Sequence, residues 1–216
     1  NYLMLPGMRG FWPYSSYYGG TIYDFSGQGR NLTYTGGVGF GRYGLVPRIS
    51  FNGTGYAYRS DGGLNPVGAF TVMSWVVFNA GAIGADNTIV GKWNMTGNQR
   101  GYVIYKSASN IITAVISGNG TNTVSVATGQ PVAANVPYFT VMRFVPSTEL
   151  ALMVNGQWFK TTASIPASVF ASSNDFQVGV RGNGGYLNGM TMLTAYCGGV
   201  TIPDELIENI YQSTRV

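Results

Sequence analysis

Short apolar runs, each closed by a glycine or asparagine turn, recur along almost the whole chain and leave few folds open to it. The run at 69–78, AFTVMSWVVF, places β-branched and aromatic residues on both of its faces, as a strand in the middle of a sandwich does. Asn155-Gly156 lies between two such runs and is the strongest hairpin signal in the chain. Further strands are predicted at 48–60 around an Asn52-Gly53 turn, 87–93, 100–107, 110–118, 122–129, 137–145, 175–182 and 189–200.

One segment near the end of the chain has the spacing of a helix instead. TIPDELIENIYQS, residues 201–213, has Pro203, Asp204 and Glu205 where a first helical turn favours them. An apolar stripe with helical spacing is formed by Ile202, Leu206, Ile207 and Ile210. The pattern therefore predicts an all-β fold, a two-sheet antiparallel jelly-roll sandwich, with one short C-terminal helix docked on it.

Composition sets the size of the core and removes several classes of partner. The chain has 216 residues, of which 45% are hydrophobic, so one large domain at 9–216 is the simplest organisation, with 1–20 as an N-terminal arm and first-strand region. Charged residues make up only 9%, and the net charge of +4 is scattered, so no nucleic-acid partner is expected. No run of about 18 apolar residues occurs, so no membrane span is expected.

A series of weak motifs in a fixed order resembles the LamG-like jelly-roll branch of the concanavalin A-like lectin/glucanase superfamily. The motifs are RGFWPY at 9–14, YDFSGQGRNLTYTG at 23–36, ISFNGTGYAY at 49–58, AFTVMSWV at 69–76, IVGKWN at 89–94, GYVIYK at 101–106, LMVNGQ at 152–157, FQVGV at 176–180, LNGMTMLTAY at 187–196 and IPDELIENIY at 202–211. The resemblance extends over residues 9–213 and implies two curved antiparallel sheets in a jelly roll, in agreement with the strand pattern.

The chain departs from this family at its acidic positions. Asn52 and Asn155 stand where the family often has Asp before Gly, and Met190-Thr191-Met192 replaces a late acidic motif. In this superfamily structural calcium usually joins an early and a late acidic residue, and only the early one is present here, as Asp24. Two interpretations of Asp24 stay open: a turn clasp that accepts backbone N–H bonds, and a weak calcium site. The ligand count favours the clasp, because Ca²⁺ takes six to eight oxygens, usually with two or more carboxylates.

The groups that hydrolytic enzymes need are scarce. The chain has no histidine and one cysteine, Cys197, which excludes Ser-His-Asp and Cys-His catalysis and an internal disulfide. A glycosidase needs two carboxylates about 5 to 9 Å apart, which on one strand means two or four residues apart. Among the eight acids, the only pair at such a spacing is Asp204 with Glu208, on the predicted helix. The sequence therefore predicts a non-enzymatic protein.

Aromatic residues near turns are the candidates for ligand contacts. Tyr23, Trp93 with Asn94, and Trp158 could stack on the apolar faces of a sugar, with the amide of Asn94 for its hydroxyls. Cross-strand packing inside the sheet, or a protein interface, is the alternative for each of them. Trp12 and Trp75 fall within apolar runs and are assigned to the core.

Two functions compete. The first is a structural or interaction domain of a virion, as a phage head-decoration or tail-fibre protein, located at the virion surface and able to bind host glycans. Its partners would be other virion subunits or copies of itself, with Met4, Leu5 and Met8 as an apolar arm. The second is a polysaccharide-binding module of an extracellular bacterial protein. A glycosidase is the third and least supported hypothesis, because the carboxylate pair is missing.

Overall fold

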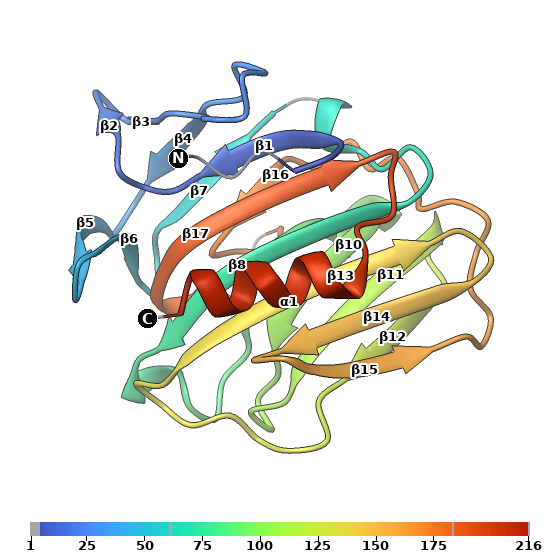
Figure 1. Ribbon diagram of the computed structural model, residues 1–216. Coiled ribbons are helices and arrows are strands. Elements are labelled where there is room, and N and C mark those ends of the chain that lie inside the picture. The colour runs from blue at the N-terminus through green and yellow to red at the C-terminus, as the bar shows by residue number, and fades with distance from the viewer. Residues whose placement is uncertain (1–4, 61, 183, 216) are drawn as a thin grey trace.

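Two antiparallel β-sheets packed face to face make up the protein, with one short helix, α1 (Asp204–Ser213), near the C-terminus (Figure 1). The computed structural model describes residues 5–60, 62–182 and 184–215. This architecture confirms the predicted two-sheet sandwich and its C-terminal helix. Trp12 and Trp75 are buried, at 0% and 3% exposure, as predicted for core residues.

The strands are distributed between an eight-stranded and a nine-stranded sheet. In spatial order, the eight-stranded sheet consists of β15 (Gln157–Thr161), β14 (Glu149–Val154), β13 (Pro137–Val145), β8 (Phe70–Phe78), β17 (Asn188–Gly198), β6 (Val46–Asn52) and β5 (Val38–Tyr43), with β1 (Met8–Trp12) paired to β17. The nine-stranded sheet consists of β12 (Thr123–Ala127), β11 (Ile112–Gly120), β10 (Gln99–Lys106), β9 (Asn87–Asn94), β16 (Phe176–Val178), β7 (Tyr56–Arg59), β4 (Leu32–Thr35), β3 (Thr21–Ile22) and β2 (Tyr17–Tyr18).

The main core lies between the two sheets, and β8 explains why its sequence is apolar on both faces. Every residue of β8 is buried. Phe70 and Val72 point into the inter-sheet core, whereas Met73 and Trp75 belong to a second apolar cluster on the outer side of the same sheet. A strand covered on both faces has no solvent side, so alternation of apolar and polar residues disappears.

Helix α1 and the N-terminal segment cover the outer face of the eight-stranded sheet. Ile207 and Ile210 of α1 join the cluster that contains Met73 and Trp75, and Figure 1 shows the helix lying across this sheet. Leu5 and Met8 belong to the same cluster and are 6% and 8% exposed. The expected apolar arm is therefore wrong for these two residues, since their side chains pack within their own chain. Met4, the third residue of that arm, lies outside the described residues.

The two Asn-Gly turns have different roles. Asn155 and Gly156 both have positive φ, at 49° and 85°, and join β14 to β15 with Val154 opposite Gln157, which confirms the predicted hairpin. The Asn52-Gly53 turn joins β6 to β7, which lie in different sheets. The motif ISFNGTGYAY at 49–58 resembles the family's Phe-Asp-Gly hairpin, which implies two paired strands in one sheet. That expectation is wrong, because this turn carries the chain from one sheet to the other.

The single cysteine is inert in this environment. Cys197 of β17 is fully buried, and this burial raises the pKa of its thiol to about 12. Because the thiolate is the reactive form, a thiol with a raised pKa is unreactive at neutral pH. In the part of the chain that the structure describes, no helix is both long and apolar enough to cross a membrane.

Candidate functional site

The outer face of the nine-stranded sheet lies on the side of the sandwich opposite α1. Successive side chains of its strands point alternately into the core and toward this open face. On β10, Tyr102 and Ile104 point into the inter-sheet core, and Val103 and Tyr105 lie on the outer face. Side chains on this face can therefore meet a ligand without displacing another element of the described fold.

Two adjoining hollows form one groove on this face. Their volumes are about 430 and 320 Å³, and Trp93, Met95 and Arg181 line both of them. Both volumes lie within the range of about 300–1,000 Å³ typical of ligand sites. Met95 is 65% exposed, which places an apolar side chain at the boundary between groove and solvent. This groove is the candidate binding site.

The floor of the groove is apolar, and Trp93 is part of it. Trp93 of β9 packs with Val103 and Val115 in a small cluster, and Tyr105 packs against that cluster. Trp93 is only 7% exposed. The structure thus brings Trp93 to a hollow, but most of its ring is used for packing within the sheet.

Two arginines bring positive charge to the groove. The guanidinium of Arg181 lies over the ring of Tyr105, 4.1 Å from the ring centroid, and its Nη2 pairs with the carboxylate of Asp86. Arg100 of β10 lies opposite Trp93, and its Nη1 donates hydrogen bonds of 3.4 and 3.2 Å to the backbone oxygens of Gly120 and Thr121. Both guanidinium groups are held in place by these contacts, so they are preorganised for a ligand.

Hydroxyl groups form the remaining wall of the larger hollow. They come from the paired strands β11 and β12 and the turn between them: Thr113, Thr121, Thr123 and Ser125. Each hydroxyl can donate one hydrogen bond and accept others. A ligand with many hydroxyl groups would therefore find partners along this wall.

Asn94, at the end of β9, lines the smaller hollow together with Trp93. Its Oδ1 accepts a hydrogen bond of 2.9 Å from the backbone N–H of Thr96. This bond closes the turn after β9 and fixes the amide, so Asn94 shapes the groove.

The other two residues expected at a ligand site lie elsewhere. Tyr23 is 38% exposed and follows β3, at the opposite end of the nine-stranded sheet from β12. Trp158 of β15 lies beside α1 on the eight-stranded sheet, and its Nε1 donates to Glu208 over 3.4 Å. Arg143 and Lys160 lie over the Trp158 ring, 4.8 and 5.0 Å from its centroid. The structure therefore does not gather the predicted ligand residues into one site.

The carboxylate of Asp24 is fully occupied by donors from its own chain. Its Oδ1 accepts from the backbone N–H of Phe11 and of Ser26, each over 2.9 Å. Its Oδ2 accepts from the Ser26 hydroxyl and the Arg30 backbone N–H, each over 2.8 Å. A calcium ion at Asp24 would have to displace some of these donors, so the geometry is that of a turn clasp.

The carboxylates of the described residues lie outside the lining of the groove. Neither hollow of the groove has an Asp or Glu among its described lining residues. Three of the acids form ion pairs instead: Asp86 with Arg181, Glu149 with Arg143, and Asp204 with Arg143 and Lys160. Among the described residues, no three His, Cys, Asp or Glu side chains lie close enough together to hold a metal ion.

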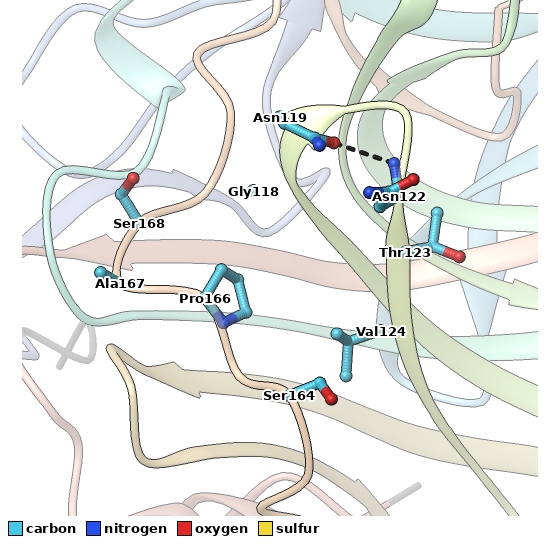
Figure 2. Close-up of a pocket in the computed structure, with 9 residues that line it drawn as sticks. All are labelled: Gly118, Asn119, Asn122, Thr123, Val124, Ser164, Pro166, Ala167 and Ser168. Atoms are coloured by element: carbon cyan, nitrogen blue, oxygen red, sulfur yellow. Dashed lines mark hydrogen bonds between the residues drawn. The ribbon is translucent and has the colours of Figure 1, made fainter.

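A further hollow of about 440 Å³ lies at the edge of the sandwich, and Figure 2 shows it between the β11–β12 hairpin and the loop at 164–168. Its lining is made of small neutral residues such as Ser164 and Pro166. Asn119 there accepts hydrogen bonds from Thr121 and Asn122 of its own turn. Its described lining holds no charged or aromatic residue, so this hollow offers fewer specific contacts than the groove.

The sequence analysis did not single out Arg100, Tyr105 or Arg181. Tyr105 follows from the alternation of side chains along 102–106. Arg100 reaches the same face only because a register shift between Arg100 and Tyr102 interrupts that alternation, which the strand pattern does not reveal. Arg181 depends on the placement of β16 beside β9, a pairing between strands far apart in the sequence. Local sequence patterns carry no information on that neighbour.

No protein-family model matches the chain, and no curated protein matches it in sequence. Similar solved structures include a botulinum neurotoxin type C structure that concerns its interaction with two ganglioside molecules, with a TM-score of 0.73, 12% identity and coverage of 97% of this chain and 52% of that chain. The binding domain of botulinum neurotoxin DC in complex with rat synaptotagmin II has a TM-score of 0.72, 13% identity and coverage of 97% and 52%.

The binding domain of Paraclostridial Mosquitocidal Protein 1 is a third such structure, with a TM-score of 0.71, 14% identity and coverage of 96% of this chain and 52% of that chain. The chain therefore spans about half the length of the solved chains that it matches. At this level of identity the likeness is one of fold: this chain has the β-sandwich jelly-roll fold found in toxin receptor-binding domains.

Proposed function

We propose that this chain is a non-enzymatic interaction domain that binds glycans in the groove on the outer face of the nine-stranded sheet. The observation that carries the proposal is the groove itself, two hollows joined through Trp93, Met95 and Arg181 on an open sheet face. Its wall of hydroxyls and its two arginines suit a ligand rich in hydroxyl groups. No carboxylate lines it among the described residues, which supports binding rather than hydrolysis.

The structural neighbours support the same class of function. One is the binding domain of botulinum neurotoxin DC in complex with SialylT, and another concerns the interaction of botulinum neurotoxin type C with two ganglioside molecules. A further neighbour was solved in complex with rat synaptotagmin II, so both ganglioside and protein partners occur among proteins of this fold. The site on this chain is argued from its own groove, because fold alone does not assign a ligand.

A bulky residue placed in the groove tests this site. Ser125 is exposed, lies on β12 and lines the larger hollow, so Ser125→Tyr is expected to fill it without disturbing the core. On a glycan array, followed by calorimetry on the best glycan, we expect Ser125→Tyr to weaken binding at least about tenfold, equivalent to about 1.4 kcal/mol.

Ala127→Tyr is the matched control, because Ala127 is exposed on the same face of the same strand and does not line the groove. We expect it to bind within about twofold of the unsubstituted chain, below about 0.5 kcal/mol. If Ser125→Tyr binds the glycan as tightly as the unsubstituted chain does, the glycan binds outside the groove. If the unsubstituted chain gives no signal on the array, the proposed function is contradicted.

The place of such a domain on a virion surface is a finer proposal, supported by two exposed hairpins. Leu45, in the turn between β5 and β6, is 87% exposed, and Tyr18 of the β2–β3 hairpin is 79% exposed. Exposed side chains of this kind suit contacts with other virion subunits or copies of the same chain. The low charged content of 9% is also compatible with a densely packed particle surface. A module of an extracellular bacterial protein is the alternative.

Light scattering separates the two settings. A virion subunit is expected to form a symmetric oligomer at micromolar concentration, and Leu45→Asp is expected to lower its mass to that of a monomer. A chain that stays monomeric and still binds a polysaccharide would favour the extracellular module.

A further inference from the structure

We infer that the groove selects glycans that carry a carboxylate, such as uronic or sialic acid units, over neutral glycans of the same shape. This inference rests on the proposed function, because it concerns the ligand class of the same groove.

The charge of the groove is one-sided. Arg100 and Arg181 line the larger hollow, and no Asp or Glu lines it among the described residues. Asp86 pairs with Arg181 from outside the lining, and its Oδ1 accepts the backbone N–H of Ala108 over 2.8 Å. One arginine is thus neutralised by a partner and the other is not, so the groove keeps a positive charge that a neutral sugar would leave unpaired.

The donors of Arg100 have the geometry that a carboxylate needs. Its Nη1 is bound to the backbone oxygens of Gly120 and Thr121. Within the described residues, its Nε and Nη2 donate no hydrogen bond and the side chain forms no ion pair. These two N–H groups form one edge of a planar fork, which binds a carboxylate through two parallel hydrogen bonds.

The aromatic rings of the groove are covered, which removes the usual contact for a neutral sugar. Trp93 is 7% exposed, and the guanidinium of Arg181 lies over the ring of Tyr105. Tyr105 is only partly exposed beneath this guanidinium, so a sugar that relied on stacking would find little open ring face here. Binding must therefore depend on hydrogen bonds and charge, through Arg100 and the hydroxyl wall of Thr113, Thr123 and Ser125.

The test uses matched glycans that differ only in charge. The probes are oligogalacturonate and sialyllactose, each with its methyl-esterified form, and a sulfated galactan oligosaccharide that has no carboxylate, each titrated into the full chain by calorimetry. We expect one carboxylated probe at least to bind about tenfold more tightly than its neutral partner, and to weaken when salt rises from about 0.05 to 0.5 M.

Substitutions assign the preference to the groove. Arg100→Gln is expected to abolish most of the difference between the charged and neutral probes, and Arg181→Gln to reduce it further. Arg42→Gln removes the same charge from an exposed site on β5 of the other sheet, and is expected to change nothing. Circular dichroism of each variant establishes that it is folded. If Arg181→Gln does not fold, Arg100→Gln alone tests the inference.

The outcomes separate this inference from the proposed function. If neutral and carboxylated partners bind equally and Ser125→Tyr blocks both, the charge inference is wrong and glycan binding in the groove stands. If the sulfated probe binds as tightly as the carboxylated ones, selection for a carboxylate is also wrong. If no glycan binds at all, the proposed function itself is contradicted.

Discussion

Asp24 joins two parts of the chain that are far apart in sequence. Through its four hydrogen bonds it connects Phe11 of β1 to Ser26 and Arg30 of the turn that follows β3. Bonds from backbone N–H groups to an ionised carboxylate are stronger than neutral ones. The Asp24 carboxylate therefore helps to attach the turn at 24–30 to β1, together with hydrogen bonds from Phe25 N–H to the backbone oxygen of Phe11 and from Trp12 Nε1 to the backbone oxygen of Arg30.

Removing this carboxylate is expected to destabilise the fold. Asp24→Ala leaves the N–H groups of Phe11 and Arg30 without their acceptor, and we expect the free energy of unfolding to fall by about 2–4 kcal/mol. Urea denaturation followed by fluorescence measures this loss. Asp175→Ala is the control, because the side chain of Asp175 forms no ion pair in the described part of the chain, and a fall of similar size there would refute the clasp.

Chelation distinguishes the clasp from a metal site at the same residue. Because both oxygens of Asp24 already accept hydrogen bonds, we expect excess EDTA to leave the melting temperature unchanged within about 1 °C. Differential scanning calorimetry with and without added Ca²⁺ is the measurement. A large fall with EDTA that Ca²⁺ reverses would establish the calcium interpretation instead.

At the scale of elements, α1 is attached to the sandwich by charge at its start and by apolar contacts along its length. Asp204 in its first turn pairs with Arg143 of β13 and with Lys160 of β15, the latter over 3.0 Å. Arg143 also donates to the backbone oxygen of Ile202 over 3.0 Å, just before the helix. The helix thus begins where this network holds the chain.

The ion pairs of Asp204 with Arg143 and Lys160 make the stability of the protein depend on pH in the acidic range. Burial alone would raise the pKa of Asp204, but hydrogen bonds and charge from Arg143 and Lys160 outweigh it, so the pKa is lowered from its ordinary 3.8. Because the pKa of Asp204 is lower in the folded state, ionised Asp204 stabilises the fold fully above pH 3.8. This stabilisation is lost as the pH falls through the folded-state pKa.

Asp204→Asn is therefore expected to lower the melting temperature at pH 5 to 7, and this deficit is expected to shrink as the pH falls below about 3.8. Melting curves of both proteins across this range measure it. Glu205→Gln, an exposed neighbour in the same helical turn, is the matched control and is expected to follow the unsubstituted protein throughout. A deficit for Asp204→Asn that stays constant down to pH 2 would contradict the network's role.

At the scale of the whole molecule, a continuous apolar core joins the two sheets. Trp12 of β1 in one sheet stacks on Phe176 of β16 in the other, with ring centroids 5.1 Å apart and both side chains fully buried. Tyr102 of β10 similarly contacts Phe70 of β8, at 4.9 Å between centroids. Because of these contacts, unfolding of one sheet would expose the apolar inner face of the other sheet. We therefore expect the two sheets to unfold together.

Phe176→Ala tests this coupling. The truncation removes the ring beneath Trp12 and leaves a cavity, and we expect it to lower the free energy of unfolding by about 3–5 kcal/mol. Tryptophan fluorescence and far-ultraviolet circular dichroism are expected to report the same transition. Tyr18→Ala, at an exposed position, is expected to cost less than about 0.5 kcal/mol, and separate transitions for the two signals would show independent sheets.

The sequence predicted the parts of this molecule that depend on local pattern. The strand runs, the Asn155-Gly156 hairpin and α1 follow from side-chain periodicity and turn chemistry, which neighbouring residues determine. The Asn52-Gly53 turn was misassigned because a turn between sheets and a turn within one have the same local residues. The groove could be predicted only in part, since Trp93 and Asn94 lie on one strand while Arg181 reaches them through a long-range strand pairing.

The placement of β1 and α1 decides how this domain can be displayed. The first described strand pairs with β17 of the eight-stranded sheet, and the last described helix lies on the outer face of that same sheet. The groove is on the outer face of the opposite sheet. An anchor joined beyond either of these elements would therefore attach the domain on the side of the eight-stranded sheet and leave the groove exposed to solvent. A tag at either end is suited to immobilising the domain on a sensor surface.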